Sequence, residues 1–164
     1  MTITTNDPLL LQQWHLKRIG VDLVFDEYRG KNVHVGIYDN GVQSDHADIS
    51  RNYDVSRQIG TSANGNHGTS VAGVIAATAN DGVGGIGVAS DAMVTGVNIF
   101  SGSASGTGMI SAIQQMTQFD VVNNSWGWTS RYADGVGTSF GQGFIAALEG
   151  AVVSGRGGLG TIIV

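Results

Sequence analysis

An aspartate and a histidine in this chain are spaced so that they could act as a catalytic pair. Asp39 follows an apolar run at 35–38, and His67 comes directly before a segment of small residues at 68–78. In α/β proteins, chemistry lies at the carboxyl ends of the strands, which is where Asp39 is expected. A histidine at the positive end of a helix dipole stays neutral, as a general base requires. A carboxylate against its other ring nitrogen would fix the tautomer. The two segments therefore predict a histidine base and an aspartate that orients it.

The remaining chain predicts the elements that position this pair. Short apolar runs between turn residues predict four strands, at 33–38, 93–99, 121–125 and 161–164. Apolar residues at helical spacing, or runs of small residues, predict four helices, at 21–28, 68–78, 109–119 and 141–153. Residues 1–20 are expected to be irregular, with Trp14 as an anchor. Because strands that alternate with helices form parallel sheets, we expect one α/β domain whose parallel central sheet carries helices on both faces.

Composition excludes several classes of function. The net charge of −5 and the scattered Lys and Arg residues give no basis for nucleic-acid binding. No apolar stretch approaches the roughly 20 residues that span a membrane. The first residues do not resemble a signal peptide. The chain has no cysteine, which excludes disulfides and thiolate metal sites, so a bound cation is one candidate for stabilising the domain.

The motifs around Asp39 and His67 resemble those of the subtilisin-like serine proteases, whose order is Asp, His, Ser. The segment 122–127, Val-Asn-Asn-Ser-Trp-Gly, is similar to the strand with which this family binds substrate backbone, and closest to its kexin-like (proprotein convertase) branch. The resemblance implies a subtilisin-like fold and a secreted or extracellular serine endopeptidase acting on peptides or proteins. It implies that His67 is the base and Asp39 its orienting group. It also implies that substrate pairs with three residues, Ser125, Trp126 and Gly127.

Two motifs of the family, the Ala-Gly-Asn of the oxyanion hole and the Gly-Thr-Ser-x-Ala of the nucleophile, do not follow the strand expected at 161–164. We therefore expect residues 1–164 to be the N-terminal portion of a single subtilisin-like peptidase domain, truncated within its sheet. Alone it is expected to be inactive and poorly soluble. Ser70 lies in a similar sequence but on the helix of His67, and Ser125 lies in the substrate strand, so neither is expected to be the nucleophile.

A glycine-rich loop at 80–87 contains the pattern GxGxxG at 82–87. A helix precedes it and a strand follows, the reverse of the dinucleotide-binding context. The resemblance instead implies a Ca²⁺ loop, whose oxygen ligands suit that cation. The implied ligands are three carboxylates and three carbonyls, from Asp7, Asp48, Asp81, Thr78, Val83 and Gly85. The alternative is a glycine turn with unconnected surface acids.

Specificity is expected to differ from that of the kexin-like branch, which uses acids to bind paired basic residues. The matching positions are neutral, namely Asn40, Asn64 and Ser130. Because each missing carboxylate removes a partner for Arg or Lys, we expect no strong dibasic preference. A second hypothesis is a non-enzymatic calcium-binding module with a degenerate fold. The presence of both Asp39 and His67 argues against it.

Overall fold

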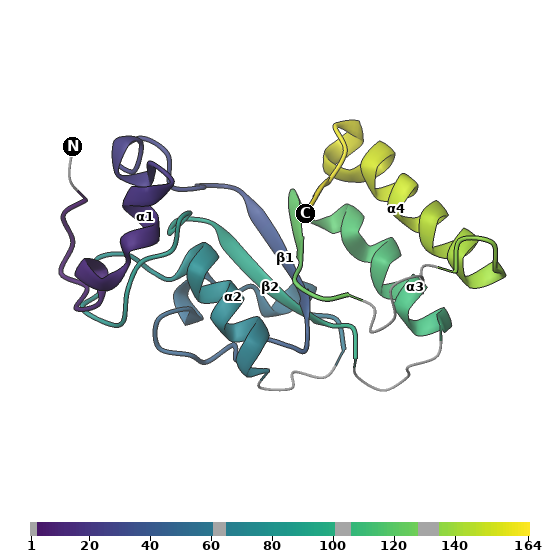
Figure 1. Ribbon diagram of the computed structural model, residues 1–164, viewed down its shortest axis with the longest axis horizontal. Helices are drawn as coiled ribbons and strands as arrows, with labels where there is room; N and C mark the ends of the chain where they lie inside the picture. Colours follow the sequence, from purple (N-terminus) through teal and green to yellow (C-terminus); the bar gives the residue numbers. More distant parts are fainter. Residues whose placement is uncertain (1–2, 61–64, 101–105, 128–134) are drawn as a thin grey trace.

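A four-stranded parallel sheet is the centre of the computed structural model, which describes residues 3–60, 65–100, 106–127 and 135–164 (Figure 1). The strand order is β2-β1-β3-β4. The strands are β1 (His34–Asp39), β2 (Met93–Asn98), β3 (Val121–Asn124) and β4 (Ile162–Ile163). Asp39 pairs with Asn98, and Tyr38 with Asn124, so the carboxyl ends of β1, β2 and β3 lie side by side. The chain has the α/β arrangement with a parallel central sheet that the sequence predicts.

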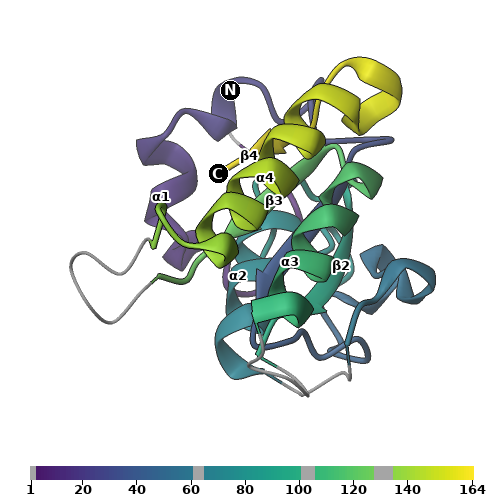
Figure 2. The ribbon, with the colours of Figure 1, turned by 90° about the vertical axis from the view of Figure 1, so that its right-hand side faces the viewer.

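Helices cover both faces of the sheet, as expected. On one face, Val35 and Ile37 of β1 pack against α2 (Asn66–Ala76) through Ala72 and Ala76. On the other, Tyr38 packs in a cluster with residues of α3 (Gly106–Gln114) and α4 (Ser139–Gly158). Figures 1 and 2 show α3 and α4 side by side across the sheet from α2. All six residues of β1 are buried because the strand is covered on both sides, which is why it reads as a continuous apolar run.

Close packing behind β1 depends on one glycine. A Cβ on Gly36 would lie 2.8 Å from the ring of Phe119. That ring is 1% exposed and meets Tyr38 edge-on at 6.1 Å between centroids. The phenyl ring therefore lies directly against the backbone of the strand that carries Asp39.

Two helices differ from their expected bounds. The helix predicted at 109–119 begins at Gly106, and its last turn is a 3₁₀ helix, η5 (Gln115–Gln118). The helix predicted at 141–153 begins after Thr138, whose side chain accepts the N–H of Gly141 and caps it. Its final part is not regular, because Arg156 and Gly157 have positive φ. This break turns the chain back toward β4.

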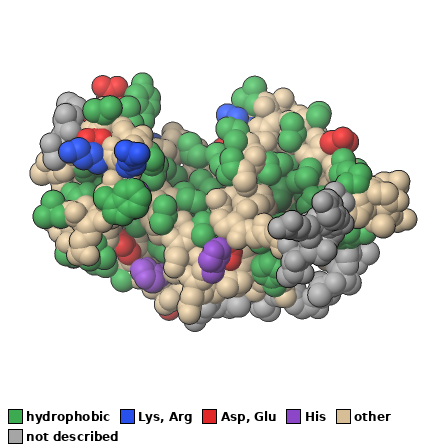
Figure 3. All heavy atoms as spheres, viewed as in Figure 1, with side chains coloured by type: hydrophobic (Ala, Val, Ile, Leu, Met, Phe, Trp, Pro, Cys, Tyr) green, Lys and Arg blue, Asp and Glu red, His purple; other side chains and the backbone are tan. Residues whose placement is uncertain are grey.

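The N-terminal segment differs most from the sequence prediction. Trp14 is not an anchor: it is 75% exposed and begins a short helix, α1 (Trp14–Arg18), while Leu16 is buried instead. No helix forms over 21–28, where the structure has a 3₁₀ turn, η2 (Val21–Leu23), and further turns. Only Val21 and Phe25 are buried there, too little packing to hold a short helix. Figure 3 shows hydrophobic side chains exposed over this end of the molecule.

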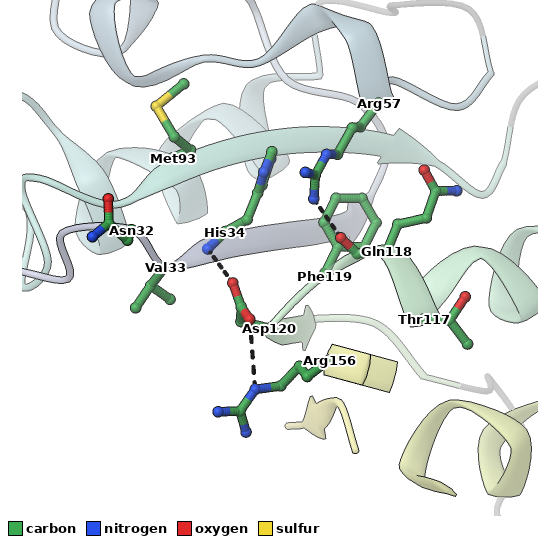
Figure 4. Close-up of a pocket in the computed structure, with 10 residues that line it drawn as sticks. All are labelled: Asn32, Val33, His34, Arg57, Met93, Thr117, Gln118, Phe119, Asp120 and Arg156. Atoms are coloured by element: carbon green, nitrogen blue, oxygen red, sulfur yellow. Dashed lines mark hydrogen bonds and ion pairs between the residues drawn. The ribbon is translucent and has the colours of Figure 1, made fainter. Parts of the chain in front are cut away.

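A polar network lies at the amino ends of the strands, the end of the sheet opposite to Asp39 (Figure 4). The backbone N–H of His34 donates to Asp120 at 2.8 Å, and Arg156 forms an ion pair with the same carboxylate at 3.5 Å. The His34 ring meets the hydroxyl of Thr95 at 2.8 Å. Burial, together with the charge of Arg57, lowers the pKa of His34. A pocket of about 270 Å³ lies beside these groups, away from Asp39.

None of the helices among the described residues is long and apolar enough to cross a membrane.

Candidate active site

The structure brings Asp39 and His67 into direct contact. Asp39 is the last residue of β1, and His67 lies in the first turn of α2. The His67 Nδ1 atom is 2.8 Å from Asp39 Oδ2 and 2.9 Å from Oδ1. A carboxylate can only accept, so Nδ1 carries the hydrogen and Nε2 of the neutral ring is left with its lone pair. The carboxylate is 4% exposed and the imidazole 58%, which leaves the ring open to solvent.

Two further contacts lie where the end of β1 meets the start of α2. The backbone N–H of Asn40 donates to Asp39 Oδ1 at 2.7 Å. Gly68 faces Asp39, and a Cβ there would lie 2.3 Å from the carbonyl oxygen of Gly41 and 3.0 Å from Asp39 Cβ. Glycine is thus required at position 68, because any side chain there would push α2, and His67 with it, away from β1.

The expected substrate segment follows β3 directly. Ser125 and Gly127 are exposed, and Trp126 is partly buried. The indole N–H of Trp126 donates to Asn124 Oδ1 at 3.2 Å. Because β3 lies beside β1 in the sheet, this segment leaves from the same edge as Asp39.

An apolar pocket beside this segment was not predicted from the sequence. Its volume is about 330 Å³, and its lining includes Trp126, Phe144, Leu148 and Ile163. The rings of Trp126 and Phe144 meet edge-on at 6.4 Å. The spacing of Phe144 and Leu148 signals an apolar helix face, but nothing in the sequence says that this face lies against β3 and β4.

The carboxylate of Asp7 ties the N-terminus to the glycine-rich loop. It accepts three backbone N–H groups, from Asn80 at 2.7 Å, Asp81 at 3.1 Å and Gly82 at 3.3 Å. Burial raises the pKa of Asp7, but hydrogen bonds from Thr5 and from these amides outweigh it and leave the pKa lowered. Asp7 is therefore a buried anion held by backbone dipoles at the predicted calcium loop.

Asp48 reaches the same loop from the other side. Its Oδ2 accepts the N–H of Gly85 at 3.1 Å, while its Oδ1 is buried without a hydrogen-bond partner. Burial raises the pKa of Asp48, and the charges of Asp81 and Asp7 raise it further. Thr78 Oγ1 is also buried without a partner. Asp48 thus has an unsatisfied carboxylate oxygen and feels the charges of two other acids, Asp7 and Asp81, and oxygen donors of this kind suit a hard cation.

The other predicted ligands lie on this loop. The N–H of Val83 donates to Asp81 Oδ1 at 2.9 Å, and the N–H of Thr78 donates to the carbonyl of Asp48 at 2.8 Å. Within the described ranges, no group of three or more His, Cys, Asp or Glu side chains forms a metal centre by itself. Any cation here must therefore draw on backbone carbonyls. Of the three neutral positions tied to specificity, Asn64 and Ser130 lie outside the described residues.

Known proteins resemble this chain over nearly its whole length. Neuroendocrine convertase 2 from Homo sapiens is 32% identical over 190 residues, which cover 99% of this chain and 29% of that protein. Furin-like protease 2 from Drosophila melanogaster is 32% identical over 180 residues, covering 96% of this chain and 10% of that protein. The chain therefore spans less than a third of the length of these relatives.

Solved structures share the fold. A serine protease of Aeromonas sobria superposes with a TM-score of 0.78 at 21% identity, covering 98% of this chain and 32% of that one. Fervidolysin from Fervidobacterium pennivorans, a keratinolytic enzyme related to subtilisin, gives a TM-score of 0.63 at 28% identity, covering 90% of this chain and 24% of that one. The model of the subtilase family (Peptidase_S8) matches residues 30–164. The chain belongs to the subtilase family and resembles its kexin-like convertases.

Proposed function

We propose that this chain is the base-carrying part of a serine endopeptidase, with His67 as general base and Asp39 as its orienting group. The observation that carries the proposal is the contact of 2.8 Å between His67 Nδ1 and Asp39 Oδ2, with Nε2 left free. Such a pair can accept a proton at Nε2 while the buried carboxylate stabilises the imidazolium that forms.

In the proposed reaction, His67 Nε2 takes the hydroxyl proton of a serine as the serine oxygen bonds to the scissile carbonyl carbon. His67 then gives that proton to the leaving amine as the C–N bond breaks. A water molecule repeats the sequence on the acyl-enzyme, returning the proton to the serine. The Gly-Thr-Ser-x-Ala segment at 68–72 lies on the helix that carries His67 and is not expected to supply the nucleophile, so we propose that activity belongs to the longer protein and that the polypeptide 1–164 alone is inactive.

The substrate is proposed to be an extended peptide or protein segment that pairs with Ser125, Trp126 and Gly127. The apolar pocket at Trp126 would receive an apolar side chain of that peptide. Asn40, beside Asp39, is an amide rather than an acid, which offers Arg or Lys no ion pair. We therefore propose no strong dibasic preference. Cleavage profiling on a peptide library tests this, and a strict Lys-Arg requirement would refute it.

We further propose that Ca²⁺ binds the loop at 78–85, held by the carboxylates of Asp7, Asp48 and Asp81 with carbonyls of Thr78, Val83 and Gly85. The unpartnered Asp48 Oδ1 supports the site. The ion would neutralise the gathered acids and bind the N-terminal segment to the loop; it has no part in the chemistry. A calcium-stabilised domain without disulfides is consistent with the proposed extracellular location.

Substitution in the full-length protein tests the catalytic proposal. We expect His67→Ala to lower kcat by at least about 10⁴-fold on a peptide substrate. Ser70→Ala is the matched control, because Ser70 is exposed on the same helix and bonds only the backbone carbonyl of Asn66. Hydrolysis that survives both His67→Ala and Asp39→Ala would refute the proposed pair. If the unaltered full-length protein hydrolyses no peptide while Ca²⁺ still stabilises the fold, the protein is instead a non-enzymatic calcium-binding module.

A further inference from the structure

The helix that carries His67 begins without a side-chain cap of its own. Gly65 is the N-cap residue of α2 and provides no side-chain acceptor. The first N–H groups of any helix have no partner within it and need an acceptor from elsewhere. For the N–H of Gly68 that acceptor is Asn40 Oδ1, at 3.1 Å, from a residue 28 positions earlier in the chain. Asn40 therefore caps α2 from outside the helix.

Asn40 also contacts Asp39, the other residue of the proposed catalytic pair. Its backbone N–H donates to Asp39 Oδ1 at 2.7 Å, the oxygen that also lies 2.9 Å from His67 Nδ1. One residue thus contacts both the carboxylate at the end of β1 and the first turn of the helix that carries the imidazole. A change in the Asn40 side chain would alter the position of that turn relative to the carboxylate.

Gly65 closes the space on one side of the Asn40 side chain. A Cβ added to Gly65 would lie 2.1 Å from Asn40 Oδ1 and 2.5 Å from the Asn40 carbonyl oxygen. Gly65 has φ −72° and ψ 110°, which any residue adopts, so its backbone does not require glycine. Glycine is needed there because the Asn40 side chain and carbonyl occupy the space.

We infer that Asn40 is a positioning residue for the Asp39–His67 pair, an inference that rests on the function proposed above. It neither touches the reacting atoms nor transfers a proton in this role. Its amide oxygen holds the first turn of α2, and its N–H holds the Asp39 carboxylate, so that Nδ1 and the carboxylate stay in contact. The acceptor oxygen is the required feature.

The test compares Asn40→Ala with Asn40→Asp in the full-length protein. Asn40→Ala removes the acceptor, and we expect kcat to fall roughly tenfold to hundredfold with KM nearly unchanged, as for a misplaced base. The proton NMR signal of the His67 Nδ1–H should broaden or move, and the Gly68 amide should exchange faster. Asn40→Asp retains an acceptor oxygen and should keep the Nδ1–H signal, the slow exchange and kcat. Asn66→Ala, on the same turn but exposed, is the matched control.

A second variant approaches the same contact without changing Asn40. Gly65→Ala should displace the Asn40 side chain and reproduce the loss of the Nδ1–H signal, which keeps the inference testable if Asn40→Ala does not fold. If Asn40→Ala keeps kcat, the Nδ1–H signal and Gly68 protection while His67→Ala abolishes hydrolysis, the positioning role is refuted and the proposed function stands. If His67→Ala leaves hydrolysis intact, the proposed function fails, and the Nδ1–H signal alone decides the contact.

Discussion

The substitution Asp39→Asn should reverse the tautomer of His67. Asp39 Oδ1 accepts the N–H of Asn40 at 2.7 Å, so the oxygen of the new amide must stay at that position. Its NH₂ group then takes the place of Oδ2, 2.8 Å from His67 Nδ1. Two donors cannot face each other at that distance. The imidazole relieves the conflict by moving its hydrogen to Nε2, so that Nδ1 becomes an acceptor.

The expected loss of activity is large because the base is then blocked. With the hydrogen on Nε2, the atom that should accept the serine proton has no lone pair in the plane of the ring. Loss of the correct tautomer and of imidazolium stabilisation costs on the order of 10⁴ in kcat. At about 1.36 kcal/mol for each factor of ten, this corresponds to about 5.4 kcal/mol in the barrier. Binding of substrate should change little, because Asp39 is buried below the imidazole.

The tautomer can be measured without turnover. The ¹⁵N chemical shifts of the His67 ring distinguish Nδ1–H from Nε2–H, and we expect the first form in the wild type and the second in Asp39→Asn. Asp45→Asn removes the same charge at an exposed position and is the matched control, with no expected change in tautomer. A wild-type ring with its hydrogen on Nε2, or an Asp39→Asn ring that keeps Nδ1–H, would refute the hydrogen-bond reasoning.

Three further outcomes follow from other parts of the molecule. At a Ca²⁺ concentration about 100-fold above Kd, chelation should lower the free energy of unfolding by about 2.7 kcal/mol and Tm by about 5–10 °C. In thermal melts, Asp48→Asn should abolish this effect of the chelator. A full chelator effect in that variant would contradict the site. Burial and the charge of Arg57 lower the pKa of His34 in the folded protein. Below pH 6.5 the unfolded chain therefore binds more protons than the folded protein does. Stability should therefore fall as pH drops through 6.5 and less so in His34→Gln, as denaturant midpoints would measure; an equal fall in both would exclude His34. Gly36→Ala should displace the Phe119 ring, which should lower the free energy of unfolding by about 1–3 kcal/mol and Tm by about 2–10 °C. A double variant that also carries Phe119→Leu should recover part of this loss. A Tm equal to that of the wild type would show that the ring moves freely.

The sequence predicted best what depends on local pattern. Strand β1 and helix α2 were found close to their bounds, because a strand covered on both faces is apolar throughout and a helix against a sheet is rich in small residues. The contact of Asp39 with His67 was anticipated from the same two elements. The proposed calcium ligands were named only through the family resemblance, since no spacing rule brings Asp7 to a loop more than 70 residues away.

The sequence failed where long-range packing decides the outcome. The segment 21–28 has apolar residues at helical spacing, but only Val21 and Phe25 find partners, and the helix does not form. Trp14 was expected to anchor residues 1–20, but it is 75% exposed, and Leu16 is the buried residue of that helix. The apolar pocket at Trp126 exists because α4 lies against β3 and β4, a relation that no local pattern encodes.

The parallel sheet has a consequence for how fast the chain folds. Every strand pair in the described sheet is parallel, so each pairing must close a long crossover before it gains a hydrogen bond. His34 is one example of these long loops, because it contacts Thr95, 61 residues later, and Asp120, 86 residues later. The entropy of closing such loops is lost before the contacts form, which raises the barrier and slows the search. The same parallel arrangement that places Asp39 at the carboxyl end of β1 therefore slows folding, and a lower chain concentration should raise the yield of folded protein.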